Sequence, residues 1–163
     1  MLIILAGLPG CGKTTIAKHL ARQLGAMHVR IDSIEQAIRD SGMFQQPEVG
    51  YRVGYAVAED NLRVGQTVIA DSVNPLAVTR NAWLAVATRA EVSAIEIELK
   101  CSNENEHKQR VETRTTDIPG LRLPVWQDVV SRDYQPWNRA HIVVDTAGQS
   151  VEQTLEVLRP ELP

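Results

Sequence analysis

The chain has 163 residues, of which 44% are hydrophobic and 23% are charged, so it is neither a low-complexity nor a fibrous sequence. That length suits one compact domain, and we expect residues 1–163 to form a single unit. The formal net charge of −3 disfavours a general clamp for nucleic acid, although it leaves a local basic groove possible.

Cysteine usage and apolar runs narrow the class of protein. The two cysteines, Cys11 and Cys101, do not make a disulfide framework, and no Cys/His spacing typical of a metal site is present. The apolar start at 1–6 is too short for a signal peptide. No apolar run approaches the ~20 residues of a membrane span. We therefore expect a soluble, cytoplasmic protein that does not act at a membrane.

The apolar pattern predicts strands that alternate with helices. A continuous apolar run at 2–6 predicts a strand buried on both faces, and the spacing of Ile16, Leu20 and Leu24 predicts a helix over 13–24. Further strands are predicted at 27–31, 67–70, 92–99 and 141–144. Further helices are predicted at 33–39, from Pro47 to Gly65, and at 75–90, 104–115, 125–132 and 151–158. The alternation predicts an α/β fold with a parallel sheet.

A glycine-rich segment follows the first predicted strand. Residues 7–14 read GLPGCGKT and match the phosphate-binding pattern GxxxxGK[ST] without a mismatch. The glycines let successive backbone N–H groups face phosphate oxygens, and the following helix N-terminus adds partial positive charge. The segment is therefore predicted to bind a nucleotide through Gly7, Leu8, Pro9, Gly10, Cys11, Gly12, Lys13, Thr14 and Thr15.

Individual side chains of this loop have predicted roles. Lys13 is expected to reach the β and γ phosphates, and the Thr14 hydroxyl is expected to bind Mg²⁺. Thr15 is expected to donate a hydrogen bond near the α-phosphate. Cys11 is predicted to be a small filler, with a redox role as the alternative because a helix N-terminus lowers the pKa of a thiol.

Other classes of nucleotide-binding protein fit the rest of the sequence poorly. No NKxD motif for guanine and no LSGGQ signature of ABC proteins is found, and a hexameric motor normally needs a longer chain. Residues 117–120, DIPG, match the DxxG pattern of GTPases but follow a polar helix, so we treat the match as coincidence. The remaining class is a small kinase that uses ATP.

Four segments carry a family resemblance: GLPGCGKTT at 7–15, RIDS at 30–33, ADSVNP at 70–75 and the arginine-bearing stretch at 110–132. Together they resemble the small P-loop kinases, which include the kinase domain of polynucleotide kinase, chloramphenicol phosphotransferase, gluconate kinase and zeta-type toxins. The resemblance implies a P-loop NTPase fold of the nucleotide-kinase type, with a five-stranded parallel sheet in the order 2-3-1-4-5. It also implies a mobile lid at about 110–132 and an acceptor that bears a hydroxyl group.

Two acids follow predicted strands, at the edge where open parallel sheets bind ligands. The resemblance implies that Asp32 takes the proton of the acceptor hydroxyl; a helix cap by Asp32 or Ser33 is the alternative. Asp71 ends an apolar strand like a Walker B acid and is predicted to hold Mg²⁺ or position the acceptor, with a capping or turn role as the alternative. Polynucleotide kinase has a basic residue shortly after its acid, whereas Glu35 stands here and disfavours a polynucleotide acceptor.

Arginines supply the candidate positive charge. Arg110 and Arg114 are four residues apart and are predicted to share a helix face. The resemblance implies that such lid arginines neutralise charge on the transferring group. The alternative is a solvated face on which Glu106 pairs with Arg110. Arg122 and Arg132 flank the other side of the loop and are weaker candidates.

The remaining candidates concern the acceptor and the base. Asn74 is a candidate for the acceptor or for a helix cap, and Arg80 for an acceptor anion or an exposed surface charge. Tyr51 is a candidate for acceptor binding or for the core. Asp145 and Thr146 follow the last strand and are expected to border adenine or to cap the last helix.

The sequence thus predicts an ATP- and Mg²⁺-dependent kinase that phosphorylates a hydroxyl of a small molecule. Lys13, Asp32, Arg110 and Arg114 are its candidate catalytic residues. Two alternatives remain open: a 5′-hydroxyl kinase for polynucleotides or nucleosides, and an ATP-binding regulator that hydrolyses ATP slowly without an acceptor. The four histidines receive no role, and the oligomeric state is not predicted.

Overall fold

The computed structural model describes residues 1–42, 46 and 48–162. The predicted helix start at Pro47 lies outside the described residues. The strands are β1 (Leu2–Ala6), β2 (Met27–Arg30), β3 (Val68–Asp71), β4 (Ala94–Lys100) and β5 (Ile142–Asp145). The helices are α1 (Lys13–Leu24), α2 (Ile31–Asp40), α3 (Val49–Arg63), α4 (Ala77–Arg89), α5 (Glu104–Thr113), α6 (Trp126–Val130), α7 (Val151–Leu158) and the 3₁₀ turn η1 (Arg159–Glu161).

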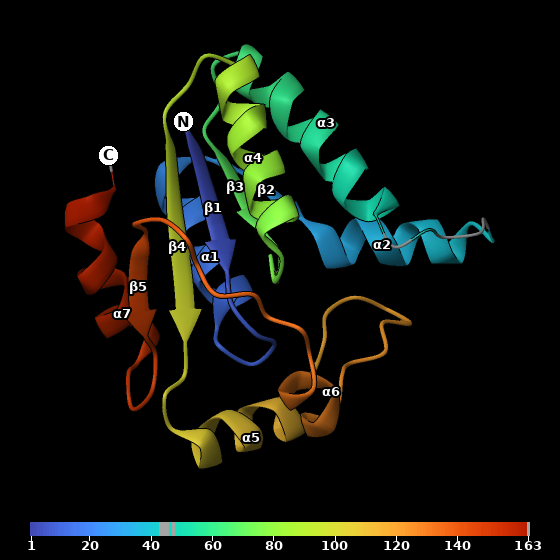
Figure 1. Ribbon diagram of the computed structural model, residues 1–163, viewed down its shortest axis with the longest axis vertical. Helices are drawn as coiled ribbons and strands as arrows, with labels where there is room; N and C mark the ends of the chain where they lie inside the picture. The colour runs from blue at the N-terminus through green and yellow to red at the C-terminus, as the bar shows by residue number, and fades with distance from the viewer. Residues whose placement is uncertain (43–45, 47, 163) are drawn as a thin grey trace.

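The strands form one parallel sheet, which confirms the predicted fold (Figure 1). Their order is β2-β3-β1-β4-β5, with β1 in the centre. Leu2 of β1 lies opposite Val68 of β3 on one side and Ala94 of β4 on the other. Every residue of β1 is buried, because helices cover both faces of the sheet.

Each face of the sheet carries its own apolar core. Ile3 and Leu5 point to one face, where they pack with Ile16 and Leu20 of α1 and with Leu158 of α7. Leu2 and Ile4 point to the other face, which α3 and α4 cover through Ala58, Leu62, Trp83 and Val86 (Figure 1). The period of two along a strand produces this division. Among the described residues, no helix combines the length and the apolar character needed to cross a membrane.

A pair of glycines sets the position of α2 against α3. A Cβ atom at Gly50 would lie 2.4 Å from Cγ of Glu35, and one at Gly54 would lie 2.4 Å from Cδ1 of Ile31. Only glycine permits so close an approach at these two positions. The first turns of α2, which carry Asp32, are therefore held against α3.

Three predicted boundaries are wrong in ways that affect the site. α2 begins at Ile31, directly after β2, so Asp32 lies in its first turn. α4 begins at Ala77 rather than Pro75, because Asn74 has a φ of 47° and Leu76 is extended. α5 ends at Thr113, and Arg114 is extended with a ψ of 148°.

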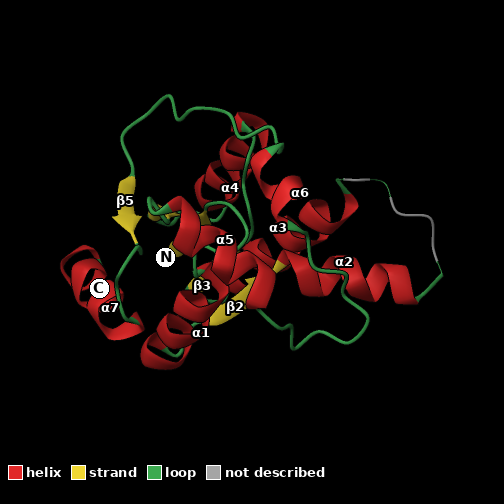
Figure 2. Cartoon of the chain, turned by 90° about the horizontal axis from the view of Figure 1, so that it is seen from below, coloured by secondary structure: helices red, strands yellow, loops and turns green. Residues whose placement is uncertain are grey.

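The carboxyl ends of the strands gather at one end of the sheet. The phosphate loop follows β1 there, and α5 and α6 lie beyond it (Figures 1 and 2). This arrangement places the segment predicted as a lid at the end of the sheet where parallel α/β folds bind ligands.

Candidate active site

The phosphate loop depends on glycine at particular positions. Gly7 has a φ of +136°, and a Cβ atom there would lie 2.2 Å from the carbonyl oxygen of Leu99. Gly12 has a φ of +87° and forms the N-cap of α1. Both conformations disfavour L side chains, so the glycines allow the chain to turn from β1 into the start of α1.

The Lys13 side chain folds back over this loop. Its Nζ donates a hydrogen bond of 2.9 Å to the carbonyl oxygen of Leu8, and only 8% of the residue is exposed. Burial lowers the pKa of Lys13, and the nearby Cys11, Asp71 and Asp32 oppose that shift. The amine is thus held within the loop and close to the acids at the strand ends.

α5 supports the loop from behind through a histidine that the sequence analysis left without a role. Nε2 of His107 donates a hydrogen bond of 2.8 Å to the carbonyl oxygen of Pro9, because a carbonyl oxygen can only accept. The His107 ring also packs edge-on against Trp126, with 5.1 Å between centroids. Cys11 lies 3.6 Å from the same nitrogen and is 2% exposed. Burial raises the pKa of Cys11, which favours the filler interpretation over a redox role.

Two cavities meet at the loop. One has a volume of about 1000 Å³ and extends between α2, α3 and the segment at 121–132. The other, of about 510 Å³, lies between the phosphate loop, α5 and the start of α7. The residues that line both cavities are Lys13, Thr14, Asp32, Arg114 and Leu123. After the roles that the sequence predicts for the residues lining them, we call the larger one the acceptor cavity and the smaller one the nucleotide cleft.

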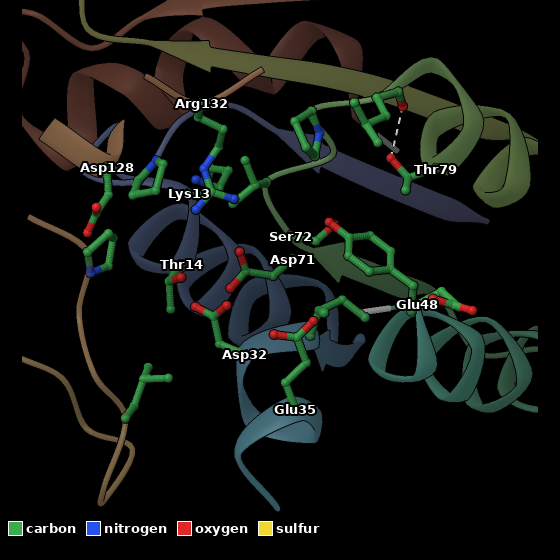
Figure 3. A pocket seen from close by; sticks show the side chains of 18 of the residues that line it. Lys13, Thr14, Asp32, Glu35, Glu48, Asp71, Ser72, Thr79, Asp128 and Arg132 are labelled. Carbon is green, nitrogen blue, oxygen red and sulfur yellow. Dashed lines mark hydrogen bonds between the residues drawn. The ribbon is translucent and has the colours of Figure 1, made fainter. Parts of the chain in front are cut away.

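Asp32 stands on the wall between these cavities. Arg30 is the N-cap of α2 and no side chain caps the helix, so the capping alternative for Asp32 or Ser33 is wrong. Figure 3 shows Asp32, Asp71 and Thr14 turned toward the same space. Glu35 lies one turn further along α2 and also lines the acceptor cavity. Burial, followed by the charge of Asp32, raises the pKa of Glu35.

Asp71 ends β3 and is almost fully buried. It is 3% exposed, and its Oδ2 lies 3.0 Å from Nε2 of His28 on β2. Asp71 belongs to the strand and bonds a side chain there, so it is not a helix cap. No role was predicted for His28, which the parallel pairing of β2 with β3 places opposite Ile69, two residues before Asp71.

The donor set fits Mg²⁺ through oxygen atoms of two side chains. Thr14 supplies a hydroxyl, and Asp71 supplies Oδ1, which has no hydrogen-bond partner among the described residues. In the same described part of the chain, no group of three or more His, Cys, Asp or Glu could hold a metal alone. Mg²⁺ commonly binds through one or two carboxylates together with substrate phosphates, which matches this set.

Arg110 and Arg114 do not share a helix face, which corrects that prediction. Arg110 donates to Oγ1 and to the carbonyl oxygen of Thr146, each at 2.8 Å, and pairs with Glu106 as the alternative interpretation held. It lines only the nucleotide cleft. Arg114 lies beyond the end of α5 and lines both cavities, and burial lowers its pKa against the opposing charge of Asp32.

Of the two candidates in the loop after β5, Thr146 lines the nucleotide cleft and Asp145 does not. Thr146 is 4% exposed and lines the nucleotide cleft. Asp145 lies outside both cavities, and its Oδ1 accepts hydrogen bonds of 3.0 Å from the backbone N–H groups of Ser102 and Ala147. The Asp145 carboxylate therefore orders the loop, and the expectation that this loop borders adenine through its backbone stays a prediction. The helix-cap alternative is wrong for both residues, because Ser150 caps α7.

Asn74 and Arg80 line neither cavity, which corrects their predicted acceptor roles, and the alternatives are wrong as well, because Leu76 is the N-cap of α4 and Arg80 is buried. Nδ2 of Asn74 donates 2.8 Å to the carbonyl oxygen of Leu5, and the residue is 0% exposed. Arg80 is 1% exposed, and its guanidinium lies over the Trp137 ring. It donates to the carbonyl oxygens of Asn74, Pro75, Gln135 and Pro136. A buried guanidinium whose donors are taken by backbone carbonyls cannot reach an acceptor, and it instead ties the loop after β3 to residues 135–136.

Tyr51 lies between the larger cavity and the apolar core, and its role in acceptor binding stays a prediction. Its ring lines the acceptor cavity, while its hydroxyl accepts a 3.2 Å hydrogen bond from the backbone N–H of Asn74. Tyr51 also packs on Tyr55, whose ring meets Trp83 of the core edge-on at 4.6 Å. The ring therefore continues the apolar core up to the wall of the cavity.

The segment between α5 and α6 is anchored by Asp117. Its carboxylate pairs with Nζ of Lys18 at 2.5 Å and with Nη1 of Arg30 at 2.7 Å. These two hydrogen bonds hold the pKa of Asp117 well below its usual range. Further along the chain, Arg122 and Arg132 line the acceptor cavity. The DxxG match thus coincides with an anchor of the predicted lid.

The family comparison covers most of the chain. The AAA_33 family, described as an AAA domain, matches residues 2–130. The chain belongs to the AAA_33 family. No curated protein matches it.

Several solved structures share the fold of this chain. A candidate kinase from Chloroflexus aurantiacus has a TM-score of 0.73 and 22% identity, covering 99% of this chain and 98% of that one. A sugar kinase from Janibacter sp. has a TM-score of 0.69 and 20% identity, covering 97% of this chain and 92% of that one. The APS kinase of Mycobacterium tuberculosis, solved with AMPPNP and APS, has a TM-score of 0.69 and 19% identity, covering 97% of this chain and 95% of that one. The motif resemblance to small P-loop kinases is thereby confirmed for the fold.

Proposed function

We propose that this chain is a kinase that transfers the γ-phosphoryl group of ATP to a hydroxyl group of a small molecule. The observation that carries the proposal is the meeting of two cavities at Lys13, Thr14, Asp32 and Arg114. A phosphoryl transfer needs its donor and its acceptor on opposite sides of one point, where catalytic groups reach both.

On the nucleotide side, the loop amides and Lys13 would hold the β and γ phosphates. Thr14 and Asp71 are the residues that would hold Mg²⁺, together with the phosphate oxygens. Mg²⁺, when bound, neutralises negative charge on the phosphates. Arg114 lines both cavities and is placed to neutralise the equatorial oxygens of the group in transit. Arg110, bonded to Thr146, would contribute to the wall of the nucleotide cleft.

On the acceptor side, Asp32 would orient the hydroxyl group. As the new O–P bond forms and the bond to ADP breaks, the hydroxyl proton passes to a carboxylate oxygen of Asp32. Because the transition state of such transfers is loose, the proton is needed late, and an ordinary carboxylate is a sufficient base. The exposure of Asp32 to both cavities suits this role.

The acceptor cavity favours a small acceptor over a polynucleotide. Asp32, Glu35 and Asp71 gather on one wall of it and would repel a phosphate next to the reacting hydroxyl, whereas the arginines of the same lining would attract anionic groups farther along the cavity. The aromatic wall of Tyr51 and Tyr55 would contact the apolar side of a compact ligand. The M. tuberculosis APS kinase holds AMPPNP and APS on the same fold, which supports assigning the two cavities to a donor and an acceptor.

A screen of ATP consumption tests the proposal. The purified chain would be incubated with Mg²⁺-ATP and sugars, nucleosides, antibiotics or 5′-hydroxyl oligonucleotides, and products would be identified by mass spectrometry. We expect a phosphorylated small molecule. Product formed only with oligonucleotides would replace the proposal with the polynucleotide kinase, and slow ATP hydrolysis unaffected by any acceptor would replace it with the regulator.

A further inference from the structure

We propose that His28 is a positioning residue for Asp71: its hydrogen bond fixes one carboxylate oxygen so that the other faces Thr14 and the nucleotide. The inference rests on the proposed function, because Asp71 is assigned there to Mg²⁺. His28 itself lines neither cavity and would act only through Asp71.

The register of the sheet brings the two side chains together. β2 pairs with β3 in parallel, with His28 opposite Ile69 and Arg30 opposite Asp71. Residues two apart on a strand share a face, so Asp71 points to the same side as Ile69. That side is covered by α1, because Ile69 packs in the core cluster that includes Ile16 and Leu20. His28 therefore reaches Asp71 along the face on which α1 begins.

The contact fixes both partners. An ionised carboxylate only accepts hydrogen bonds, so Nε2 of His28 carries the proton that lies between the two residues. The bond joins Nε2 to Oδ2 at 3.0 Å, with Asp71 3% exposed and His28 19% exposed at their side chains. Because both side chains are largely buried, water does not easily replace the imidazole as the partner of Oδ2. The other carboxylate oxygen, Oδ1, remains available as an acceptor or metal ligand.

Lys13 explains why such a positioning contact is needed. Its charge interacts with that of Asp71, and its Nζ is bonded to the carbonyl oxygen of Leu8 in this structure. An untethered Asp71 could rotate toward this amine and form an ion pair with it. That pair would withdraw a carboxylate oxygen from Mg²⁺ and an amine from the phosphates. The hydrogen bond from His28 opposes this rotation.

Nucleotide binding measured over a titration of Mg²⁺ tests the inference. ATP affinity would be measured by calorimetry for the unmodified chain, His28→Leu and His28→Gln. The glutamine amide places a donor near the position of Nε2, whereas leucine fills the space without one. His19→Leu, at an exposed position on α1, is the matched control.

We expect His28→Leu to raise the half-saturating Mg²⁺ concentration about tenfold, as loss of a partner behind a metal ligand typically does. His28→Gln and His19→Leu should stay close to the unmodified chain. Unchanged Mg²⁺ dependence in His28→Leu, or equal impairment in His28→Gln, would overturn the inference while leaving the kinase proposal intact. Failure of the unmodified chain to bind ATP would overturn both.

Stability measurements and a second variant distinguish a folding defect from loss of the hydrogen bond to Asp71. Circular dichroism and thermal unfolding would accompany every titration. If His28→Leu does not fold, His28→Asn replaces it, because its shorter amide keeps a polar side chain but cannot span the distance to Asp71. The same tenfold loss is expected for His28→Asn, and its absence would equally overturn the inference.

Discussion

The two sides of the site are built from different materials. On the nucleotide side, the phosphate loop consists of backbone groups and a buried lysine, packed against Leu99 and His107. On the acceptor side, the wall consists of side chains on α2, α3 and residues 114–132, many of them exposed or half-exposed. Backbone geometry suits a ligand group that never changes, whereas side chains allow the acceptor to differ between proteins of one fold.

The largest effect should follow from removing the charge within the loop. Lys13→Met keeps the carbon chain but removes the ammonium that would contact the phosphates. We expect phosphoryl transfer to fall about 10²–10³-fold, the range typical for removing one preorganised donor. The measurement is the transfer rate at saturating acceptor, with Lys108→Met, at an exposed position of α5, as the control. Normal turnover of the Lys13→Met variant would contradict the assignment of the phosphate loop to the nucleotide.

Next in size is the effect on stability of the buried guanidinium behind the acceptor cavity. Arg80→Met should leave several backbone carbonyl oxygens without donors, each costing about 1–3 kcal/mol when buried. We expect the free energy of unfolding to fall by about 3 kcal/mol in urea titrations. Arg89→Met on the same helix removes an exposed ion pair and should cost about 1 kcal/mol or less. Equal losses would show that Arg80 is not part of the framework.

The smallest effect concerns the anchor of the predicted lid. Asp117→Asn removes an exposed charge that pairs with Lys18 and with the half-buried Arg30. Because Asp117 itself faces solvent, we expect a loss of about 1 kcal/mol or less at neutral pH. Because the pKa of Asp117 is lowered in the folded chain, this stabilisation is present above the usual Asp pKa of about 3.9 and is lost as the pH falls.

Thermal unfolding over a pH series checks this linkage. The difference between the unmodified chain and Asp117→Asn should be full at pH 7 and shrink below about pH 4. Asp133→Asn, at another exposed position, should show little difference across the series. A difference that grows on acidification would contradict the assignment.

The contrast between local backbone geometry and tertiary packing also explains which features could be predicted from the sequence. The apolar alternation specifies the strands, and GLPGCGKTT specifies the loop, because both patterns follow from local backbone requirements. Arg80 and Asn74 were misassigned because their burial depends on residues 135–137 and on β1, which are distant in sequence. The shared helix face of Arg110 and Arg114 was wrongly predicted because α5 ends at Thr113, one residue before Arg114.

His28 and the glycine pair illustrate what long-range information adds. Nothing around His28 marks it, and its partner becomes evident only once β2 is paired with β3. Gly50 and Gly54 look like helix-weakening residues in the sequence, yet they admit Glu35 and Ile31 of α2. Such contacts depend on tertiary packing, which local patterns do not encode.

The central claim is that Asp32 serves the acceptor and not the nucleotide, and a single comparison tests it most directly. Asp32→Asn would be measured for ATP affinity and for the rate of phosphoryl transfer, beside Asp40→Asn at the end of the same helix. We expect transfer to fall about 10²–10⁴-fold in Asp32→Asn, as for loss of a general base, with ATP affinity nearly unchanged. Full transfer activity in Asp32→Asn, or a loss explained entirely by weaker ATP binding, would contradict the account.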